Sequence, residues 1–119
     1  MAVCIADSSE GKDHPLKSVA RILDAVGLAD CYYTQMASGA ALVDSIDRSN
    51  SMIMVIDEIG HYFSGVNGKN AGAHSREIMP MLTEMYTCSN DMYKEKTRKG
   101  MIGRVIYEPN LSLIGFSTE

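Results

Sequence analysis

The sequence predicts an α/β domain built on a parallel sheet that helices cover on both faces. Apolar runs of strand length alternate with segments of helical periodicity, and turn residues separate them. One run, residues 52–56, is apolar throughout, which is typical of a strand buried on both faces. The 119 residues suffice for one compact domain and not comfortably for two, so we treat residues 1–119 as a single domain.

Composition and charge limit the classes of protein to which the chain can belong. Hydrophobic residues make up 45% and charged residues 22% of the chain, as in ordinary globular proteins. The net charge of −4 gives no global reason to expect nucleic acid, although a local basic patch could still bind it. No apolar run is long enough to span a membrane. The N-terminal MAVCIADSSEGK lacks a basic region, and its apolar run is too short for a secretory signal. The three cysteines fit neither a disulfide framework nor a zinc site, so we expect reduced thiols and a cytoplasmic location.

The first two segments predict a strand, a loop and a helix. Residues 2–6 are an apolar run, and residues 7–15 are rich in turn and capping residues. Apolar side chains over residues 16–26 recur at helical spacing. Pro15 suits the first turn of this helix and Gly27 suits its end.

The middle of the chain predicts a second strand and helix before the buried strand. Residues 31–37 are aromatic and favour a strand or an extended loop, and Ser38 can cap a helix over residues 39–49. The strand over residues 52–56 follows. Residues 61–75 are rich in Gly, Asn and Ser, which predicts a mobile loop.

The last third predicts a helix, a basic turn and two strands. Residues 76–93 have helical periodicity, and residues 94–100 form the basic turn. Residues 101–108 alternate like a strand, and residues 111–119 form the last strand. A parallel sheet of this kind usually continues beyond such a strand, so we expect a partial domain, truncated at its C-terminus.

Polar residues follow three of the predicted strands. The first strand leads into ADSSEGKD, the third into Asp57 and Glu58, and the last ends in Ser117 and Thr118. The carboxyl ends of parallel strands meet at one edge of a sheet, where ligands of such folds bind. We therefore expect these residues to lie close together.

The loop after the first strand has features of a phosphate-binding loop. Backbone N–H groups of such a loop and of the following helix can cradle a phosphate, and Lys12 could add a positive charge. In the pattern G-x-x-x-x-G-K-[ST], Gly11 and Lys12 match, while Ala6 replaces the first Gly and Asp13 replaces the Ser or Thr. The match is partial, and an ordinary strand–helix turn stays open as the alternative.

The acid pair after the third strand fits a nucleotide-hydrolysing site. Asp57 would hold Mg²⁺ through water, and Glu58 would orient and deprotonate the attacking water. Two adjacent carboxylates repel each other, and a bound dication would offset that repulsion. The alternative is that both acids begin a solvated loop. His61 could line the same cleft, although a structural or solvent-facing role is favoured for it.

Together these segments resemble the core of P-loop ATPases of the RecA-like and AAA+ grouping, which have an additional strand and a catalytic glutamate. ADSSEGKDHP resembles the Walker A region, MIMVIDEIG the Walker B region, and LSLIGFST the sensor-1 strand. More narrowly, GKDHPLKSVARILDAVGL, VIDEIGHYF and PNLSLIGFSTE resemble poorly characterised ATPases of phages and prophages that are primase–helicase-like. The resemblance spans nearly the whole chain and implies a three-layer P-loop NTPase core.

The resemblance also implies a role for individual residues. Lys12 would be the phosphate lysine, Glu58 the catalytic base, and Thr118 the sensor, with Ser117 as the alternative. Asp57 would be the magnesium acid, and Asp13 could be a second metal ligand or could repel the phosphate. The residues implied to bind ATP are Ser8, Ser9, Glu10, Gly11, Lys12 and Asp13.

The leading hypothesis is a Mg²⁺-dependent ATPase core that works on DNA or in a DNA-replication assembly of a phage or mobile element. Such enzymes often complete their site from a neighbouring subunit, so the analogy implies a homo-oligomer. DNA could contact Lys94, Lys96, Arg98 and Lys99, with a solvated surface as the alternative. Two other functions stay open: a degenerate P-loop fold that binds DNA or a protein without hydrolysis, and a nuclease that uses Asp57 and Glu58 alone.

Overall fold

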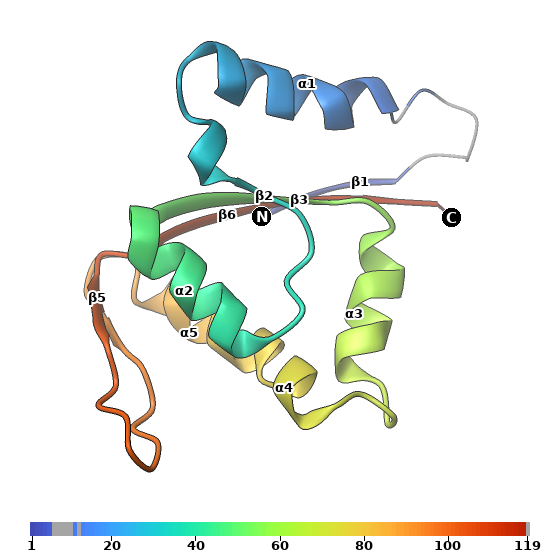
Figure 1. Cartoon of the computed structure of the whole chain (residues 1–119). Helices are drawn as coiled ribbons and strands as arrows, with labels where there is room; N and C mark the ends of the chain where they lie inside the picture. Colours follow the sequence, from blue (N-terminus) through green and yellow to red (C-terminus); the bar gives the residue numbers. More distant parts are fainter. Residues whose placement is uncertain (6–10, 12, 119) are drawn as a thin grey trace.

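The structure is a computed structural model and describes residues 1–5, 11 and 13–118 of the chain. Its centre is a four-stranded parallel sheet with the strand order β1-β6-β3-β2 (Figure 1). The edge strands β1 and β2 flank the central pair of β6 and β3. The four strands are β1 (Ala2–Ile5), β2 (Tyr32–Tyr33), β3 (Ser51–Ile56) and β6 (Asn110–Ser117).

Helices lie on both faces of this sheet. In Figure 1 α1 lies over one face and the other helices lie over the opposite face. The chain crosses the sheet in one direction from β1 to β2 and returns from β2 through β3 to β6, so right-handed connections place α1 on its own face. The prediction of a parallel sheet flanked by helices is confirmed. The helices are α1 (Asp13–Ala25), α2 (Gly39–Ser49), α3 (Ile59–Asn67), α4 (Ala73–Arg76) and α5 (Ile78–Thr87).

The hydrophobic core lies between the sheet and the layer of α2, α3 and α5. Leu42 of α2, Met54 of β3 and Ile78 of α5 are all fully buried. Burying one such side chain contributes about 1.5–3 kcal/mol. On the other face α1 buries Leu23 alone of its residues, and the residues of β1 are all exposed. Packing against α2, α3 and α5 therefore stabilises the sheet more than packing against α1.

The predicted buried strand is confirmed as β3. It pairs with β2 on one side and β6 on the other, and its last three residues are all buried. The predicted helix over residues 39–49 is confirmed as α2, and the Ser38 hydroxyl accepts a hydrogen bond from the Ala41 N–H at 3.2 Å. The helix predicted from residue 16 to residue 26 is confirmed as α1, and Gly27 follows it with φ +76°.

The segment 61–75 was expected as a mobile loop, and this prediction is wrong. It folds as most of α3 and as α4. Ile59, Tyr62 and Val66 lie at helical spacing and are buried, and the Tyr62 hydroxyl donates to the Met36 carbonyl at 2.9 Å. Burial of this face stabilises the helix despite the weak helix propensity of its Gly, Asn and Ser residues.

The prediction for the segment before the last strand is also partly wrong. Residues 76–93 were predicted as one helix, but α5 ends at Thr87. The chain then forms β4 (Met92–Lys94), which pairs antiparallel with β5 (Val105–Tyr107) in a separate two-stranded sheet. The strand predicted over residues 101–108 thus exists as β5, outside the parallel sheet. No described helix is both long and apolar enough to cross a membrane.

Candidate functional site at the carboxyl edge of the sheet

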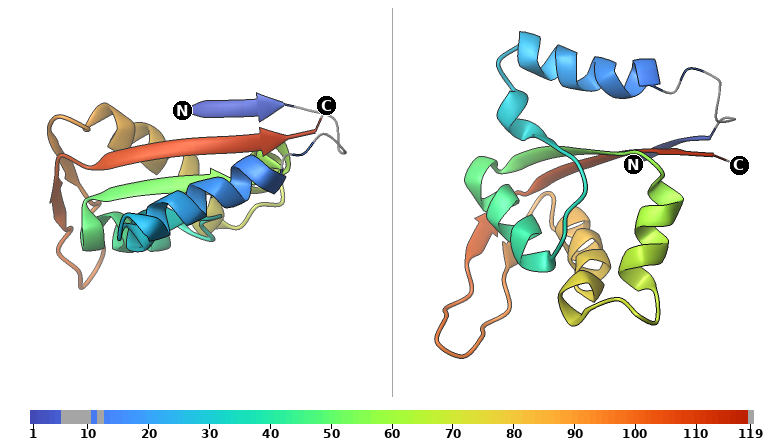
Figure 2. Two further views of the ribbon diagram at one scale, coloured as in Figure 1. Left: turned by 90° about the horizontal axis from the view of Figure 1, so that it is seen from above. Right: turned by 45° about the vertical axis from the view of Figure 1, so that its right-hand side comes forward.

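Three strand ends meet at one edge of the parallel sheet. Ile5 at the end of β1 pairs with Ser117 of β6, and Ile56 at the end of β3 pairs with Gly115 of β6. Figure 2 shows β1, β6 and β3 pointing in the same direction. Neighbouring strands lie about 4.8 Å apart, so the ends of β1 and β3 are roughly 10 Å apart with β6 between them. The strand ends converge as the sequence predicts.

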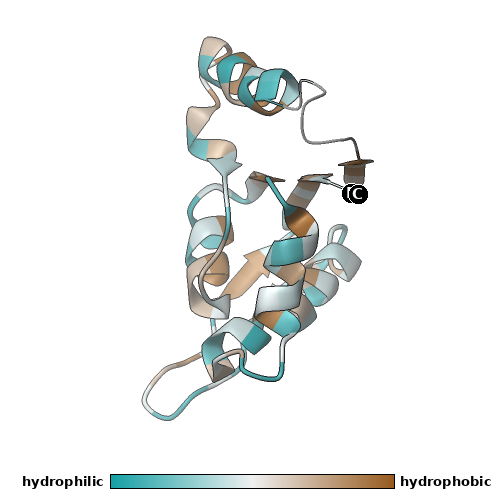
Figure 3. Ribbon diagram, turned by 90° about the vertical axis from the view of Figure 1, so that its right-hand side faces the viewer, coloured by the Kyte–Doolittle hydropathy of each residue, from teal (hydrophilic) through white to brown (hydrophobic). Residues whose placement is uncertain are grey.

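Viewed from this edge, the sheet separates α1 from the other helices (Figure 3). The helix that follows β1, α1, lies on one face, and the acid pair after β3 leads to α3 on the other face. A ligand at the edge would therefore lie between the face that α1 covers and the start of α3. This is the position where open α/β sheets bind their ligands.

Glu58 lies between β3 and α3 in a strained backbone conformation. Its φ of 49° and ψ of 51° place it in the left-handed region, and it is the N-cap residue of α3. For a residue other than glycine this conformation costs about 1 kcal/mol or more, and such strain clusters at functional sites. The turn directs the exposed Glu58 to the carboxyl edge while the next residue, Ile59, is buried.

Gly115 of β6 allows α3 to begin close to the sheet. Any Cβ atom at this position would collide with the side chain of Ile59. The short distance between β6 and the start of α3 therefore depends on the missing side chain at Gly115. Gly115 was not among the predicted site residues, although a glycine inside a strand is a signal of close backbone approach.

A hydrogen bond connects the predicted base with the predicted sensor. The Thr118 hydroxyl donates to Glu58 Oε2 at 3.2 Å. Ser117, the alternative sensor, donates instead to the Thr118 carbonyl at 3.2 Å. The structure therefore brings Thr118, and not Ser117, to the Glu58 carboxylate. Asp57 lies beside them and its Oδ1 accepts from the Glu58 N–H at 2.9 Å.

The predicted phosphate loop is described only in part. Gly11 has φ +74°, and its carbonyl accepts from the His14 N–H at 3.2 Å at the start of α1. Asp13 is exposed and is the first residue of α1. A carboxylate there is favourable to the helix dipole but repels an anion bound at the same place. Six residues of the predicted loop lie outside the described part: Ala6, Asp7, Ser8, Ser9, Glu10 and Lys12.

The acidic residues at this edge fit Mg²⁺ held together with a nucleotide. The described part of the chain contains no group of three or more His, Cys, Asp or Glu residues that could hold a metal. Mg²⁺ commonly keeps several waters and takes one or two carboxylates together with substrate phosphates. Asp57 is exposed and could supply one carboxylate, and Asp13 at the start of α1 could supply a second.

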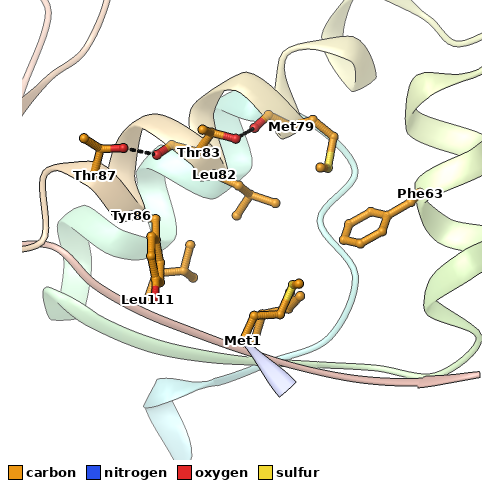
Figure 4. A pocket seen from close by; sticks show the side chains of 9 residues that line it. Met1, Phe63, Met79, Leu82, Thr83, Tyr86, Thr87 and Leu111 are labelled. Carbon is orange, nitrogen blue, oxygen red and sulfur yellow. Dashed lines mark hydrogen bonds between the residues drawn. The ribbon is translucent and has the colours of Figure 1, made fainter. Parts of the chain in front are cut away.

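An apolar cavity of about 510 Å³ lies away from the acid pair, between β6, α3 and α5. Figure 4 shows Phe63, Met79 and Leu82 around it, with Met1 from the edge of the sheet. The two hydrogen bonds drawn there run from Thr83 to the Met79 carbonyl and from Thr87 to the Thr83 carbonyl. These bonds satisfy the threonine hydroxyls within α5, so the cavity offers mainly apolar surface.

His61 lines a second cavity of about 500 Å³ together with Gln35 and Ser75. Neither Asp57 nor Glu58 lines that cavity. The structural or solvent-facing role that the sequence favours for His61 stays a prediction.

The predicted DNA-contacting residues lie on the β4–β5 hairpin, away from the acid pair. The hairpin leads into the start of β6, whereas the acids follow the end of β3 (Figure 1). Arg98 is engaged in an ion pair with Glu77 at 2.9 Å. Any contact of the hairpin with DNA would therefore be separate from the acid pair.

Comparisons of the chain with protein-family models, with curated proteins and with solved structures found no match in any of the three. The fold and the geometry of its carboxyl edge are therefore the basis for the function proposed below.

Proposed function

We propose that the chain is the Mg²⁺-dependent, ATP-binding and ATP-hydrolysing core of a P-loop ATPase of the RecA-like or AAA+ type. The hydrogen bond from Thr118 to Glu58 carries this proposal, because it joins the predicted sensor to the predicted base. The position of β6 between β1 and β3 adds support, since the resemblance is to ATPases with an additional strand.

Each residue at the edge has a role in this proposal. Glu58 accepts a proton from the attacking water, and the Thr118 hydroxyl holds one oxygen of that carboxylate in place. Lys12 contacts the phosphates, and Asp57 holds the metal. Bound Mg²⁺ would neutralise charge on the β- and γ-phosphate oxygens.

The proposal includes work on DNA, in a replication assembly of a phage or mobile element. It rests on the resemblance to primase–helicase-like ATPases and on the lysines of the β4–β5 hairpin. A homo-oligomer is proposed by analogy with ATPases that complete their site from a neighbouring subunit.

A second candidate is a nucleotide fold that binds a partner or DNA without hydrolysis. Asp13 favours this candidate, because it places a carboxylate in the first turn of α1, where the phosphates would bind. The repulsion would weaken triphosphate binding.

Phosphate release by the full-length chain tests the proposal. We expect turnover that requires Mg²⁺ and falls at least about 100-fold in Lys12→Ala, because a positioned charge on the phosphates is lost. Lys17→Ala is the matched control, since Lys17 is an exposed lysine of α1. Equal turnover in the wild type and Lys12→Ala would contradict the proposal.

Two further outcomes separate the alternatives. Calorimetry that detects Mg²⁺–ATP binding without turnover would favour the binding module. Metal-dependent DNA cleavage that is insensitive to Lys12→Ala would favour a nuclease that uses Asp57 and Glu58.

A further inference from the structure

The β4–β5 hairpin is anchored firmly to the rest of the domain. Its inner face buries Tyr93 and Ile106, which are opposite each other in the two strands. Glu95 is 8% exposed and accepts hydrogen bonds from the Arg104 side chain. Arg104 also forms an ion pair with Asp44 of α2 at 2.7 Å. The base of the hairpin is therefore fixed against the helical layer.

The outer face of the hairpin mixes apolar and cationic side chains. Met92 is opposite Tyr107, and Lys94 is opposite Val105. All four side chains are exposed, and Tyr107 is 68% exposed. The period of two along each strand separates this outer face from the buried inner face.

The tip of the hairpin presents two large apolar side chains to solvent. Arg98 and Met101 form an isolated antiparallel bridge, and Gly100 between them has φ +83°. Ile102 is 90% exposed and Met101 is 59% exposed. Exposed apolar surface of this kind is unfavourable in water and indicates a contact when it is combined with an anchored arm.

Three lysines lie along the arm and the tip of the hairpin. In the described residues Arg98 pairs with Glu77, and Arg104 pairs with Glu95, Asp44 and Asp47. Lys94, Lys96 and Lys99 are exposed and form no ion pair within that part of the chain. The exposed acids Asp91 and Glu108 lie at the base of the hairpin, so the positive charge of these lysines is concentrated toward its tip.

We propose that the β4–β5 hairpin binds duplex DNA, with its lysines on the phosphates and with Met101 and Ile102 inserted at a base step. A two-stranded β-ribbon can lie in the minor groove, and lysines on it can reach the backbone phosphates. Met and Ile are among the side chains that wedge between base steps. This inference deepens the DNA contact of the proposed function and rests on it, but it requires no nucleotide.

An anionic membrane is the less favoured partner. Proteins that lie on membranes bury a long apolar face in the interface. The hairpin offers a narrow tip of two apolar side chains, and its lysines continue along the arm at Lys94 and Lys96. A row of cations along an arm fits the row of phosphates beside a DNA groove better than it fits the flat surface of a membrane.

The test uses the full-length chain, a short DNA duplex that contains 2-aminopurine, and no ATP. We expect binding, measured by fluorescence anisotropy, and a rise in 2-aminopurine emission as the base step opens. Replacing Lys94, Lys96 and Lys99 by Gln should weaken binding and reduce the slope of log K against log salt by about 2.7. A control with the same charge change replaces Lys17, Arg21 and Lys69 by Gln and should leave this slope nearly unchanged.

The tip is tested separately from the lysines. The double variant Met101→Ser and Ile102→Ser should keep the salt slope and lose most of the rise in emission, because phosphates but not bases are still contacted. These side chains are exposed, and thermal unfolding checks that each variant folds. An unchanged salt slope in the lysine variant, or an unchanged emission rise in the tip variant, would overturn the proposal.

Vesicles of phosphatidylcholine and phosphatidylserine provide the competing partner. Binding to these vesicles without binding to the duplex would also overturn the proposal. The assays contain no nucleotide, so a failure of ATP hydrolysis leaves their result unaffected, and the failures of the two proposals can be told apart.

Discussion

For the proposed ATPase we expect that replacing Glu58 with Gln lowers ATP turnover by about 100- to 10,000-fold and leaves ATP binding nearly unchanged. The amide keeps the size of the side chain but cannot accept the proton of the attacking water, which accounts for an effect of this order. Steady-state phosphate release and calorimetry measure the two quantities. Glu84→Gln is the matched control, because Glu84 is an exposed acid of α5 and its replacement makes the same charge change.

Replacing Glu58 with Gly separates catalysis from stability at the same position. Turnover is lost as in Glu58→Gln, but the free energy of unfolding exceeds that of Glu58→Ala by about 1 kcal/mol. Both variants lose the hydrogen bond from Thr118, and only glycine adopts the left-handed conformation without strain. Thermal unfolding measures this difference. Wild-type turnover in either Glu58→Gln or Glu58→Gly would contradict the role of Glu58, and a Glu58→Gly variant no more stable than Glu58→Ala would contradict the strain at this turn.

Replacing Arg104 with Met lowers the free energy of unfolding by about 3 kcal/mol. Glu95 is nearly buried, and without the Arg104 guanidinium its charge keeps only the weaker attraction of Arg98. Removing both charges in Arg104→Met with Glu95→Met should recover part of the loss. Arg98→Met is the control: its ion pair with Glu77 is exposed, so we expect a loss below about 1 kcal/mol. Urea unfolding measures all four proteins.

The same cluster predicts how stability depends on pH. Hydrogen bonds from the Arg104 guanidinium lower the pKa of Glu95 below its ordinary value of 4.5. A carboxylate with a lowered native pKa stabilises the fold above its unfolded pKa, and this contribution is lost as the pH falls through the native value. The wild type should therefore lose more stability than Arg104→Met as the pH falls below about 4.5. Equal losses in the two proteins would contradict this account of Glu95.

Much of the parallel sheet could be predicted from the sequence because its strands have strong local signals. The run from Met52 to Ile56 is apolar at every position. Such a run is typical of a central parallel strand, because helices cover both faces of that strand. The helices α1 and α2 were predicted from apolar periodicity, from Gly27 and from the cap at Ser38. The residues that predict each helix lie close together in the sequence, so each helix can be predicted from a short segment.

The errors arise where tertiary packing overrides local propensity. The glycines and serines of residues 61–75 indicate a loop locally, yet burial of Ile59, Tyr62 and Val66 stabilises α3. The hairpin was missed because β4 has three residues and ten residues separate it from its partner strand. Pairing of the two strands across this separation depends on the burial of Tyr93 and Ile106. No local sequence pattern predicts that burial.

The residues of the candidate site could be proposed from the sequence, but their geometry could not. The acids and Thr118 follow apolar strands, and this position in the sequence identified them. The left-handed turn at Glu58 and the close approach at Gly115 depend on contacts between β6 and α3. The placement of β6 between β1 and β3 is also a property of the whole sheet. The hydrogen bond to Glu58, which distinguishes Thr118 from Ser117, forms only in the folded sheet.

The central claim is that the loop bearing Lys12 and the acid pair after β3 hold one metal–nucleotide complex. Iron(II) bound in place of Mg²⁺ with ATP, in the presence of ascorbate and peroxide, cleaves the backbone close to the metal. We predict cuts both within residues 7–13 and near residues 57–58, and both sets should require the nucleotide. Cuts at only one of these two segments, or cuts that do not depend on ATP, would contradict the claim.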